Sequence, residues 1–270
     1  MHKEKLAHLG TLSNDELPIV QSLLLIGAIE VEQQDIQAYE TLLVAMHDAV
    51  TVLNPKDDLQ LRAEVLQKVI HTEFGFRGDT EEYDRVDHMN FLRVLDRRKG
   101  IPVALGALYL HLAQEQGWSA VGLNFPGHFL VRMDLGAQRL IIDPYHGVID
   151  LKASDMRHLL KRVLGDKAEL DHHYYDAVTA RDVVLRFCNN RKSRLIQSEY
   201  YQQALNLIKL EIIVAPNEPR LLFDAGMIAM RLDLIHESLS YMDQFIQHST
   251  DTKTINEAKE IQRHLRQIIQ

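Results

Sequence analysis

The chain lacks several features that would point to a familiar chemistry or location. Its 270 residues contain a single cysteine, Cys188, which excludes an internal disulfide and any CxxC metal or redox motif. One cysteine is typical of a reducing compartment, so we expect a cytoplasmic protein. No apolar run reaches the roughly 18 residues that a membrane-spanning helix needs. The longest run, residues 19–29, follows two acidic residues and predicts a buried helix rather than a signal peptide.

Positive charge and aromatic rings are scarce as well. The chain has 30 Lys and Arg residues against 38 Asp and Glu residues, a formal net charge of −8, and 7% aromatic residues. Nucleic-acid binding needs many cations to neutralise phosphates, and single-strand recognition adds aromatic stacking. We therefore expect neither a nucleic-acid nor a membrane partner. The short basic clusters at 97–99 and 191–194 are interpreted as solvated helix faces.

Helical periodicity dominates the first part of the chain. The apolar spacing predicts a helix after a cap at Ser13 or Asn14, and then helices over residues 36–53, 59–74, 88–99 and 102–116. Asp87 is the predicted cap of the fourth helix, and Pro102 suits the first turn of the fifth. This fifth helix is apolar on nearly every side, which places it in the middle of a domain.

Alternation of apolar and polar residues follows the fifth helix. Period two runs through residues 120–125, 128–134 and 138–143, which predicts an antiparallel meander. A buried helix followed by such a meander gives an α+β fold. Helical patterns then return and continue without interruption from about residue 180. We therefore predict two domains, an α+β domain over residues 1–178 with a helical N-terminal part and an all-α domain over residues 179–270.

The second predicted domain repeats itself weakly. A shift of about 34 residues, the length of one tetratricopeptide helix-turn-helix unit, aligns Glu199 with Asp233 and Leu205 with Leu239. We call this shift the repeat period. At most two units are visible, followed by a predicted capping helix over residues 255–269. Such helices usually present a groove to a peptide, and the alternative that a short array only supports its neighbour stays equally open.

A possible functional site lies in the meander. A tight turn at Leu135-Gly136 would place His128 opposite Asp143 on neighbouring strands, and cross-strand partners share one face of a sheet. An imidazole and a carboxylate paired in this way can serve as the base and the orienting group of a nucleophilic site. Four further residues are predicted to line the same cleft as binding residues, namely Asn124, Arg132, Tyr145 and His146.

The same region contains donors for a metal ion and an anion. His128, Asp143 and His146 supply nitrogen and oxygen ligands from adjacent strands. The 14 histidines are nevertheless scattered, and none shows HExxH spacing. We therefore predict no metal and no other cofactor. Arg132 can meet an anionic group or form an ion pair with Asp134 or Asp143.

Several motifs together resemble one bacterial family. They are residues 73–78 (EFGFRG), 90–92 (NFL), 94–102 (VLDRRKGIP), 124–130 (NFPGHFL) and 142–144 (IDP). In this order and spacing they resemble the SirB-type family over nearly the whole chain. The resemblance implies a transglutaminase-like, cysteine-protease-like core with an antiparallel sheet, followed by an all-α array of tetratricopeptide repeats.

The resemblance also implies a catalytic residue that this chain lacks. Transglutaminase-like enzymes place a cysteine at the N-terminus of a buried helix, where the positive partial charge stabilises a thiolate. A histidine and an aspartate follow on neighbouring strands. His128 and Asp143 match these two positions, but Pro102 stands about where the cysteine would be. No Cys, Ser or Thr occurs between Met89 and Trp118.

Two functions remain open at this point. The first is a non-catalytic scaffold or regulatory protein that holds a protein or peptide partner, with His128 and Asp143 pinning the hairpin or lining a binding cleft. The second is a cysteine-independent hydrolase or amide transferase, in which His128, oriented by Asp143, acts as general base on water. Asn124 or Arg132 would then stabilise developing negative charge. Cys188 lies in an apolar stretch and is interpreted as a buried side chain rather than a nucleophile.

Overall fold

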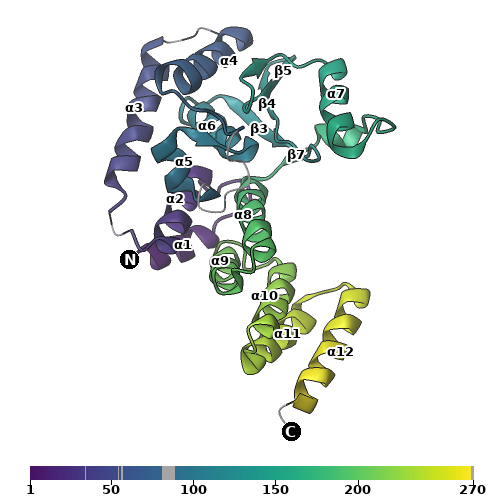
Figure 1. Ribbon diagram of the computed structural model, residues 1–270. Helices are drawn as coiled ribbons and strands as arrows, with labels where there is room; N and C mark the ends of the chain where they lie inside the picture. The colour runs from purple at the N-terminus through teal and green to yellow at the C-terminus, as the bar shows by residue number, and fades with distance from the viewer. Residues whose placement is uncertain (34, 54, 56, 81–88, 269–270) are drawn as a thin grey trace. The chain divides into compact units, whose positions relative to one another are not determined.

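The chain forms two compact units in the computed structural model, which describes residues 1–33, 35–53, 55, 57–80 and 89–268. The first, which we call the sheet unit, is Ser13–Phe187. The second, the repeat unit, combines Met1–Leu12 with Cys188–Gln270. Figure 1 shows that the strands of the described residues all belong to the sheet unit, which gives the predicted α+β class. The domain boundary predicted between residues 178 and 179 stays a prediction.

The sheet unit is mostly helical. Its helices are α2 (Ile19–Glu30), α3 (Gln37–Leu53), α4 (Leu59–Gln67), a π-helix (Lys68–Glu73), α5 (Phe91–Arg97), α6 (Pro102–Glu115), α7 (Ala153–Leu164), a 3-10 turn (His172–Tyr175) and the start of α8 (Ala180–Gln197). The helices predicted over residues 36–53 and 102–116 agree with α3 and α6 within one residue at each end. The helix predicted over 59–74 is divided, because its second half takes the wider π-helical turn. Within the described residues, every helix is too short or too polar to cross a lipid bilayer.

One predicted helix start is wrong, and another lies outside the described residues. The sequence predicts that the first helix begins at Ser13 or Asn14, but α2 begins at Ile19, after the extended backbone of Pro18. The predicted cap Asp87 lies outside the described residues. The observed cap of α5 is Asn90, whose side-chain oxygen accepts from the Leu92 N–H at 3.0 Å. The Asn90 amide also donates to the Gly27 carbonyl at 3.0 Å, so one buried cap ties α5 to α2.

The sheet is antiparallel, as predicted, with strand order β6-β5-β4-β3-β7. Its strands are β3 (Ser119–Leu123), β4 (Val131–Leu135), β5 (Gln138–Asp143), β6 (Val148–Ile149) and β7 (Ala177–Val178), and a separate parallel pair joins β1 (Arg77–Gly78) to β2 (Lys99–Gly100). In Figure 1 the strands β4 and β5 lie between α4 and α7. A buried cluster that includes Ile141 of β5 and Met156 of α7 fills the space on the α7 side.

The predicted hairpin register is wrong by two residues. The predicted register would pair Val131 with Leu140, whereas Val131 pairs with Ile142. The turn is Gly136-Ala137 rather than Leu135-Gly136, since Gly136 adopts a φ of +59° at the first central position, as a two-residue hairpin of type II′ requires. A shift of two residues keeps each side chain on its predicted face, so the error does not separate His128 from Asp143.

Two glycines, one on the central helix α6 and one on β3, make room for a ring in the segment before β4. Gly106 of α6 and Gly122 of β3 both face the ring of Phe129. A Cβ atom at Gly106 would lie 2.3 Å from the Phe129 ring, and one at Gly122 would lie 2.6 Å from it. The buried ring therefore sits where any larger residue would collide with it, and it positions the neighbouring His128.

The repeat unit contains the predicted repeat period. Its helices are α1 (His2–Gly10), the end of α8, α9 (Tyr201–Val214), α10 (Pro219–Arg231), α11 (Ile235–His248) and α12 (Thr252–Ile268). The helix α11 begins and ends one repeat period after α9. The helix α12 agrees with the predicted capping helix. The helix α1, which the sequence placed in the first domain, packs on α9, and a Cβ atom on Gly10 would lie 2.1 Å from the Ile213 carbonyl oxygen.

The turns between paired helices recur with the same spacing. Glu199 and Asp233, one repeat period apart, both take left-handed backbone conformations, with φ of 60° and 57°. The N–H of Tyr200 bonds to the Leu195 carbonyl at 2.8 Å, and the N–H of Leu234 bonds to the Ala229 carbonyl at 3.0 Å. These bonds have the six-to-one spacing of a Schellman motif, which satisfies carbonyls at the helix end.

The basic cluster 191–194 is partly buried, which corrects its interpretation as a solvated helix face. Arg191 is 9% exposed and Lys192 is 6% exposed. The Lys192 ammonium lies 2.9 Å from an Asp224 carboxylate oxygen and 3.3 Å from one of the buried Glu211. Burial alone would lower the pKa of Lys192, but these two carboxylates outweigh it and raise the pKa, so the ammonium stays charged. The spacing of apolar residues along one helix does not predict which of its charged side chains will be buried against another helix.

Replacing Gly106 with alanine should destabilise the sheet unit. The new methyl group would overlap the Phe129 ring, and overpacking of this kind costs about 1–3 kcal/mol. Better helix propensity offsets about 1 kcal/mol of that cost. Urea unfolding followed by the fluorescence of Trp118, the only tryptophan, measures the change in this unit. In the Gly106→Ala/Phe129→Leu double variant the loss should be smaller than the sum of the single losses, and a strictly additive result would contradict the clash.

Replacing Lys192 with methionine should destabilise the repeat unit by about 3–5 kcal/mol, because Glu211 would keep a buried charge without its ammonium partner. The matched control is Lys209→Met. Lys209 pairs with Glu237 at 2.6 Å, but both side chains are about a third or more exposed, so we expect a loss of about 0–1 kcal/mol. Hydrogen exchange in α9 and α10 reports the local opening, and equal protection in the two variants would contradict the buried pair.

Candidate functional site

The site is built on the carboxylate of Asp143, the last residue of β5. Asp143 is 2% exposed. Its Oδ1 atom accepts hydrogen bonds from the backbone N–H groups of Tyr145 at 2.9 Å and His146 at 3.2 Å. An aspartate before a proline favours this local turn, in which the side chain bonds to the backbone that follows it. The loop that follows Asp143 therefore holds the carboxylate in place through residues adjacent in sequence.

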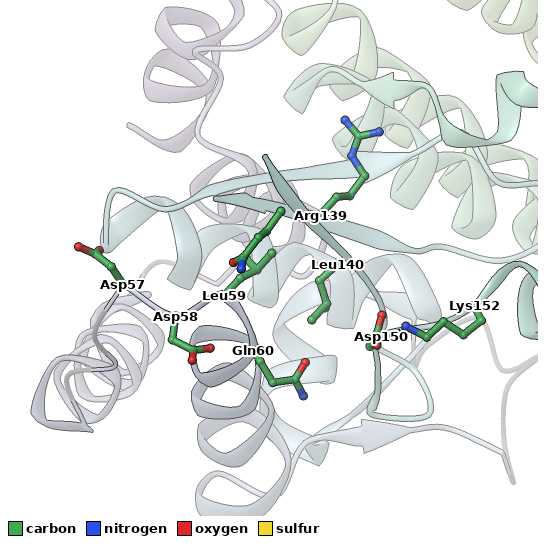
Figure 2. A pocket seen from close by; sticks show the side chains of 9 residues that line it. Asp57, Asp58, Leu59, Gln60, Arg139, Leu140, Asp150 and Lys152 are labelled. Atoms are coloured by element: carbon green, nitrogen blue, oxygen red, sulfur yellow. Dashed lines mark hydrogen bonds and ion pairs between the residues drawn. The ribbon is translucent and has the colours of Figure 1, made fainter. Parts of the chain in front are cut away.

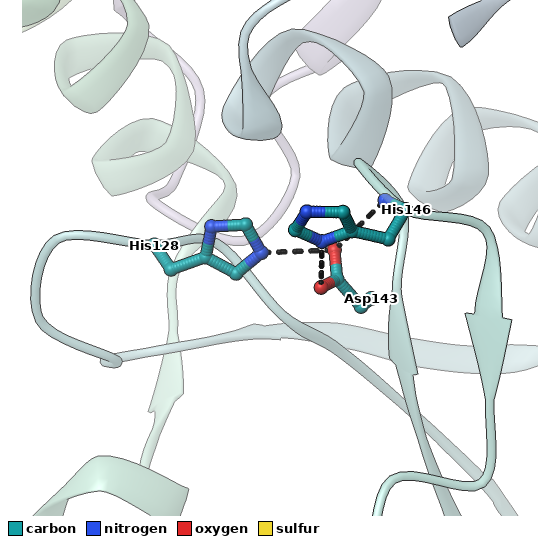
Figure 3. Close-up of side chains that lie close together, drawn as sticks. All are labelled: His128, Asp143 and His146. Atoms are coloured by element: carbon teal, nitrogen blue, oxygen red, sulfur yellow. Dashed lines mark hydrogen bonds and ion pairs between the residues drawn. The ribbon is translucent and has the colours of Figure 1, made fainter. Parts of the chain in front are cut away.

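Two imidazoles share this carboxylate, as Figure 3 shows. His128 Nε2 lies 2.8 Å from Asp143 Oδ1, and His146 Nδ1 lies 2.7 Å from Asp143 Oδ2. The predicted contact between His128 and Asp143 is thus present. The sequence predicts His146 only as a residue lining the cleft, whereas it binds the second oxygen. Since an ionised carboxylate only accepts, we assign a proton to each of these two nitrogens, which leaves His128 Nδ1 and His146 Nε2 as acceptors when the rings are neutral.

The two histidines differ in their exposure to solvent. The His128 side chain is 10% exposed and that of His146 is 42% exposed. Burial alone would raise the pKa of Asp143, but its hydrogen bonds and charge interactions with the two histidines outweigh burial and lower the pKa. The carboxylate is therefore ionised at neutral pH.

A second, partly buried pair lies near Asp143. His71, on the π-helix, has Nδ1 2.8 Å from the Phe76 carbonyl and Nε2 3.1 Å from the Tyr109 hydroxyl. The carbonyl only accepts, so Nδ1 carries the proton and the Tyr109 hydroxyl donates to Nε2. Burial lowers the pKa of His71, and burial together with the Asp143 charge raises the pKa of Tyr109. Both groups are therefore neutral near pH 7.

Residues distant in sequence anchor the loop of Asp143. The Tyr145 hydroxyl donates to the Asp79 carbonyl at 2.8 Å, and its ring packs so close to Gly78 that a Cβ there would lie 2.7 Å from it. Gln67 donates to the Gly147 carbonyl at 2.6 Å. The Asp79 carboxylate is held in turn by Arg97 at 2.8 Å. Arg97 belongs to the basic cluster 97–99, so this cluster supports the site and is not simply a solvated face.

The segment of His128 is held from another direction by Arg186 of α8. The Arg186 guanidinium donates to the carbonyls of Phe125 and His128, both at 2.6 Å, and lies over the Phe129 ring at 5.4 Å. The sequence pattern does not predict Arg186, Gln67, His71 or Tyr109 as part of the site. No short spacing links them to residues 128–146, so only the fold could reveal them.

Two predicted binding residues do not join the cluster. Arg132 forms the predicted ion pair with Asp134, with 2.9 Å between Nε and Oδ2, and donates to the Tyr175 carbonyl at 3.2 Å. Asn124 is exposed, and its backbone N–H bonds to the Asp176 carbonyl at 3.0 Å. The side chains that surround Asp143 are instead those of His128, Tyr145 and His146, whose rings contact one another.

The start of α6 provides no nucleophile. Pro102 occupies the first turn of the helix, and Ile101, Pro102 and Val103 are all buried. The only thiol of the sequence, that of Cys188, is 1% exposed. Cys188 belongs to the repeat unit, whereas His128 belongs to the sheet unit.

A cavity of about 520 Å³ opens at the other end of β5 from Asp143. It is lined by the start of α4, the start of β5 and the segment before α7, namely Asp57, Asp58, Leu59, Gln60, Gln138, Arg139, Leu140, Asp150 and Lys152. Figure 2 shows the Arg139 guanidinium directed away from Asp58 and Gln60. Arg139 pairs with Asp134, and Lys152 with Asp150, so the cations of the cavity already have partners.

Two family models match the chain. A model described as the transglutaminase-like superfamily matches residues 36–189, and a model described as the tetratricopeptide repeat matches residues 192–263. The chain is therefore a protein of the transglutaminase-like superfamily followed by tetratricopeptide repeats. The buried helix, the antiparallel sheet, the His128/Asp143 pair and the repeat period agree with this assignment.

The relatives give the more particular assignment. A UPF0162 protein of Vibrio cholerae serotype O1 is 30% identical over 236 residues, which cover 87% of each chain. A UPF0162 protein of Xylella fastidiosa strain Temecula1 is 24% identical over 92% of this chain and 90% of its own. A UPF0162 protein of Buchnera aphidicola from Acyrthosiphon pisum is 27% identical over 80% of each chain. The chain belongs to this UPF0162 family. No solved structure matches it.

Asp143→Asn should destabilise the sheet unit by about 1.5–3 kcal/mol, the usual contribution of hydrogen bonds to a charged group. An amide has one oxygen in place of two, so it cannot accept from both imidazoles and both backbone N–H groups. The matched control is Asp134→Asn, because Asp134 also pairs with two side chains, those of Arg132 and Arg139, but is 24% exposed. There we expect about 0–1 kcal/mol. Urea unfolding followed by Trp118 fluorescence compares the two variants, and equal losses would contradict the central place of Asp143.

Proposed function

We propose that this protein is a non-catalytic member of its superfamily that binds a protein or peptide partner and acts as a scaffold or regulator. One observation carries the proposal: the base and the orienting group are present, but the helix that should supply the nucleophile begins with buried apolar residues and Pro102. His128 is also largely inaccessible, with 10% of its side chain exposed. A base needs a reachable proton to abstract, and among the described residues the start of α6 offers His128 no nucleophile.

The sharing of Asp143 supports the same proposal. In a nucleophilic site the carboxylate orients one imidazole toward the nucleophile. Here the carboxylate holds His128 and His146 together, and their rings stack at 5.6 Å with an angle of 30°. The arrangement fits a clamp that ties the turn before β4 to the turn after β5.

The repeat unit offers a surface for a partner. A cavity of about 510 Å³ lies among α10, α11 and α12, lined by Pro219, Arg220, Phe223, Asp224, Phe245, His248, Ser249, Thr250, Asp251, Thr254 and Glu257. Phe223 and Phe245 provide an aromatic floor, and Glu257 and Arg220 are exposed at its rim. Peptide recognition by helical repeats uses grooves with this combination of apolar floor and polar rim.

The alternative function is a cysteine-independent hydrolase or amide transferase. Its support is the orientation of His128, which bonds to Asp143 through Nε2 and leaves Nδ1 to act as a base on water. Asn124 or Arg132 is expected to stabilise negative charge in this alternative, but Arg132 is committed to Asp134 and the Tyr175 carbonyl, and Asn124 does not join the cluster. We therefore rank this function second. We also propose a cytoplasmic location, on the ground of the single, buried cysteine.

The full chain used as bait should capture a partner from a lysate of its source organism, and Glu257→Lys should weaken that capture by at least about tenfold. Reversing a charge at the rim of a groove commonly costs more than about 1.4 kcal/mol when the partner contacts it. The matched control is Glu260→Lys, which makes the same change on an exposed part of α12 outside the cavity. Capture is quantified by mass spectrometry, and His128→Ala should retain it.

A panel of amide and ester substrates provides the opposing test. We expect no turnover by the wild-type chain. Hydrolysis or amide transfer that disappears in both His128→Ala and Asp143→Asn would overturn the non-catalytic proposal in favour of the alternative. Loss of capture in Glu260→Lys as well as in Glu257→Lys would remove the cavity from the proposal.

A further inference from the structure

The structure brings metal-ligating side chains together at two places within its described residues. One is the cluster of His128, Asp143 and His146, and the other is the run Asp171, His172 and His173. The three residues of the run are all exposed and adjacent in sequence. The first cluster joins residues from two different turns around one buried carboxylate. In the first cluster the fold brings His128 to the other two residues, whereas in the run the three residues are close only because they are adjacent in sequence.

We propose that His128, Asp143 and His146 bind one divalent transition-metal ion, with Zn²⁺ as the reference ion. The ligand atoms are His128 Nε2, His146 Nδ1 and a carboxylate oxygen of Asp143, which all lie within 4.8 Å of one another. Two imidazole nitrogens and one carboxylate oxygen are ligands that suit zinc, iron, nickel and copper rather than magnesium or calcium. The proposal departs from the metal-free expectation of the sequence, goes beyond partner binding and does not depend on it.

The observed distances leave only a small movement for the ion to enter. Zinc lies about 2.0–2.2 Å from imidazole nitrogen and carboxylate oxygen, so two ligands in a tetrahedral site are roughly 3.3 Å apart. His128 Nε2 is now 2.8 Å from Asp143 Oδ1, and His146 Nδ1 is 2.7 Å from Asp143 Oδ2. Each of these nitrogen–oxygen distances would lengthen by about half an ångström around a bound ion. Each neutral imidazole moves the proton from its ligating nitrogen to its other ring nitrogen by exchange with solvent, so the ring stays neutral and binding changes its tautomer; a protonated imidazole would release one proton to solvent.

The backbone around the ligands is held in place independently of any ion. The N–H groups of Tyr145 and His146 fix the Asp143 carboxylate, and Arg186 holds the His128 carbonyl. Gln67 holds the Gly147 carbonyl at the end of the same loop. Ligands positioned by their surroundings lose little entropy on binding, which favours affinity for a metal ion.

Charge and access also fit a cation. Asp143 supplies a buried carboxylate, and a divalent ion bound by one carboxylate and two neutral imidazoles would leave the three-ligand set with a net positive charge of one. The His146 side chain is 42% exposed, so an ion can reach the cluster from its side. Three protein ligands leave at least one coordination position for water or for a donor from a partner.

The test is a calorimetric titration of the full chain, prepared without a histidine tag and treated with a chelator. Zn²⁺ should bind with one saturable site at the cluster, and Mg²⁺ should not bind there. His146→Ala should weaken Zn²⁺ binding by at least about tenfold, the loss expected even for residues that only support a ligand. Zn²⁺ should also raise the unfolding temperature of the wild-type chain and not that of the variant. The matched control is His172→Ala/His173→Ala, which removes two exposed histidines from the other cluster and should leave the site intact.

Two further variants test the same site, one of them in case His146→Ala does not fold. His146→Gln retains a side-chain N–H that can donate to Asp143 but is a poor zinc ligand, so it replaces His146→Ala if that variant does not fold, as judged by circular dichroism. Asp143→Asn should abolish the site. The proposal is overturned if the wild-type chain shows no saturable Zn²⁺ site, or if binding persists in a folded His146 variant. It is equally overturned if binding is lost in His172→Ala/His173→Ala and kept in the His146 variants.

Discussion

The sheet unit depends on how one buried carboxylate is satisfied. Asp143 could not stay ionised at 2% exposure without several donors, because desolvating an unpaired charge costs several kcal/mol. Two backbone N–H groups and two imidazoles supply those donors. The loop after β5 and the turn before β4 must therefore keep the positions that deliver them. The further contacts from Tyr145 to Asp79 and from Arg186 to His128 stabilise the same two segments.

The central helix α6 contributes packing to the sheet unit and no reactive side chain to its first turn. Every residue from Pro102 to Leu110 is buried, and Gly106 leaves space for the Phe129 ring that positions His128. The helix therefore still performs the structural work that a transglutaminase-like core requires. Its first turn has no atom that could attack a carbonyl group. The carboxylate of Asp143 and its two imidazoles form a hydrogen-bonded cluster beside this helix, which is consistent with the proposed binding and metal coordination.

The repeat unit follows a different principle, in which local turn chemistry sets the period. The left-handed residues Glu199 and Asp233 and their Schellman bonds end two helices one repeat period apart. This regularity depends on residues close in sequence. The ion pairs of Lys192 with Glu211 and Asp224 instead join three helices, and they place charge inside the unit. The unit therefore combines locally specified turns with a buried polar contact that only assembly of the helices creates.

The sequence by itself determined the features that rest on short-range periodicity. Apolar spacing predicted α3 and α6 closely, alternation predicted the antiparallel strands, and the repeat period predicted the paired helices. The His128/Asp143 contact was also predictable, because a hairpin brings its two arms together even when the register is wrong by two residues. The register itself failed because the choice of turn depends on which residue can adopt a positive φ, and Gly136 took the first central position.

Tertiary structure alone decided how deeply each polar side chain is buried and what it meets. The pattern of charges predicted that residues 191–194 would be solvated, yet Lys192 is buried against carboxylates from two other helices. His71, Tyr109 and Arg186 reach the site from segments far from residues 128–146. The physical reason is that desolvation and hydrogen bonding depend on neighbours in space. Periodicity along a chain records only which side of its own helix or strand a residue occupies.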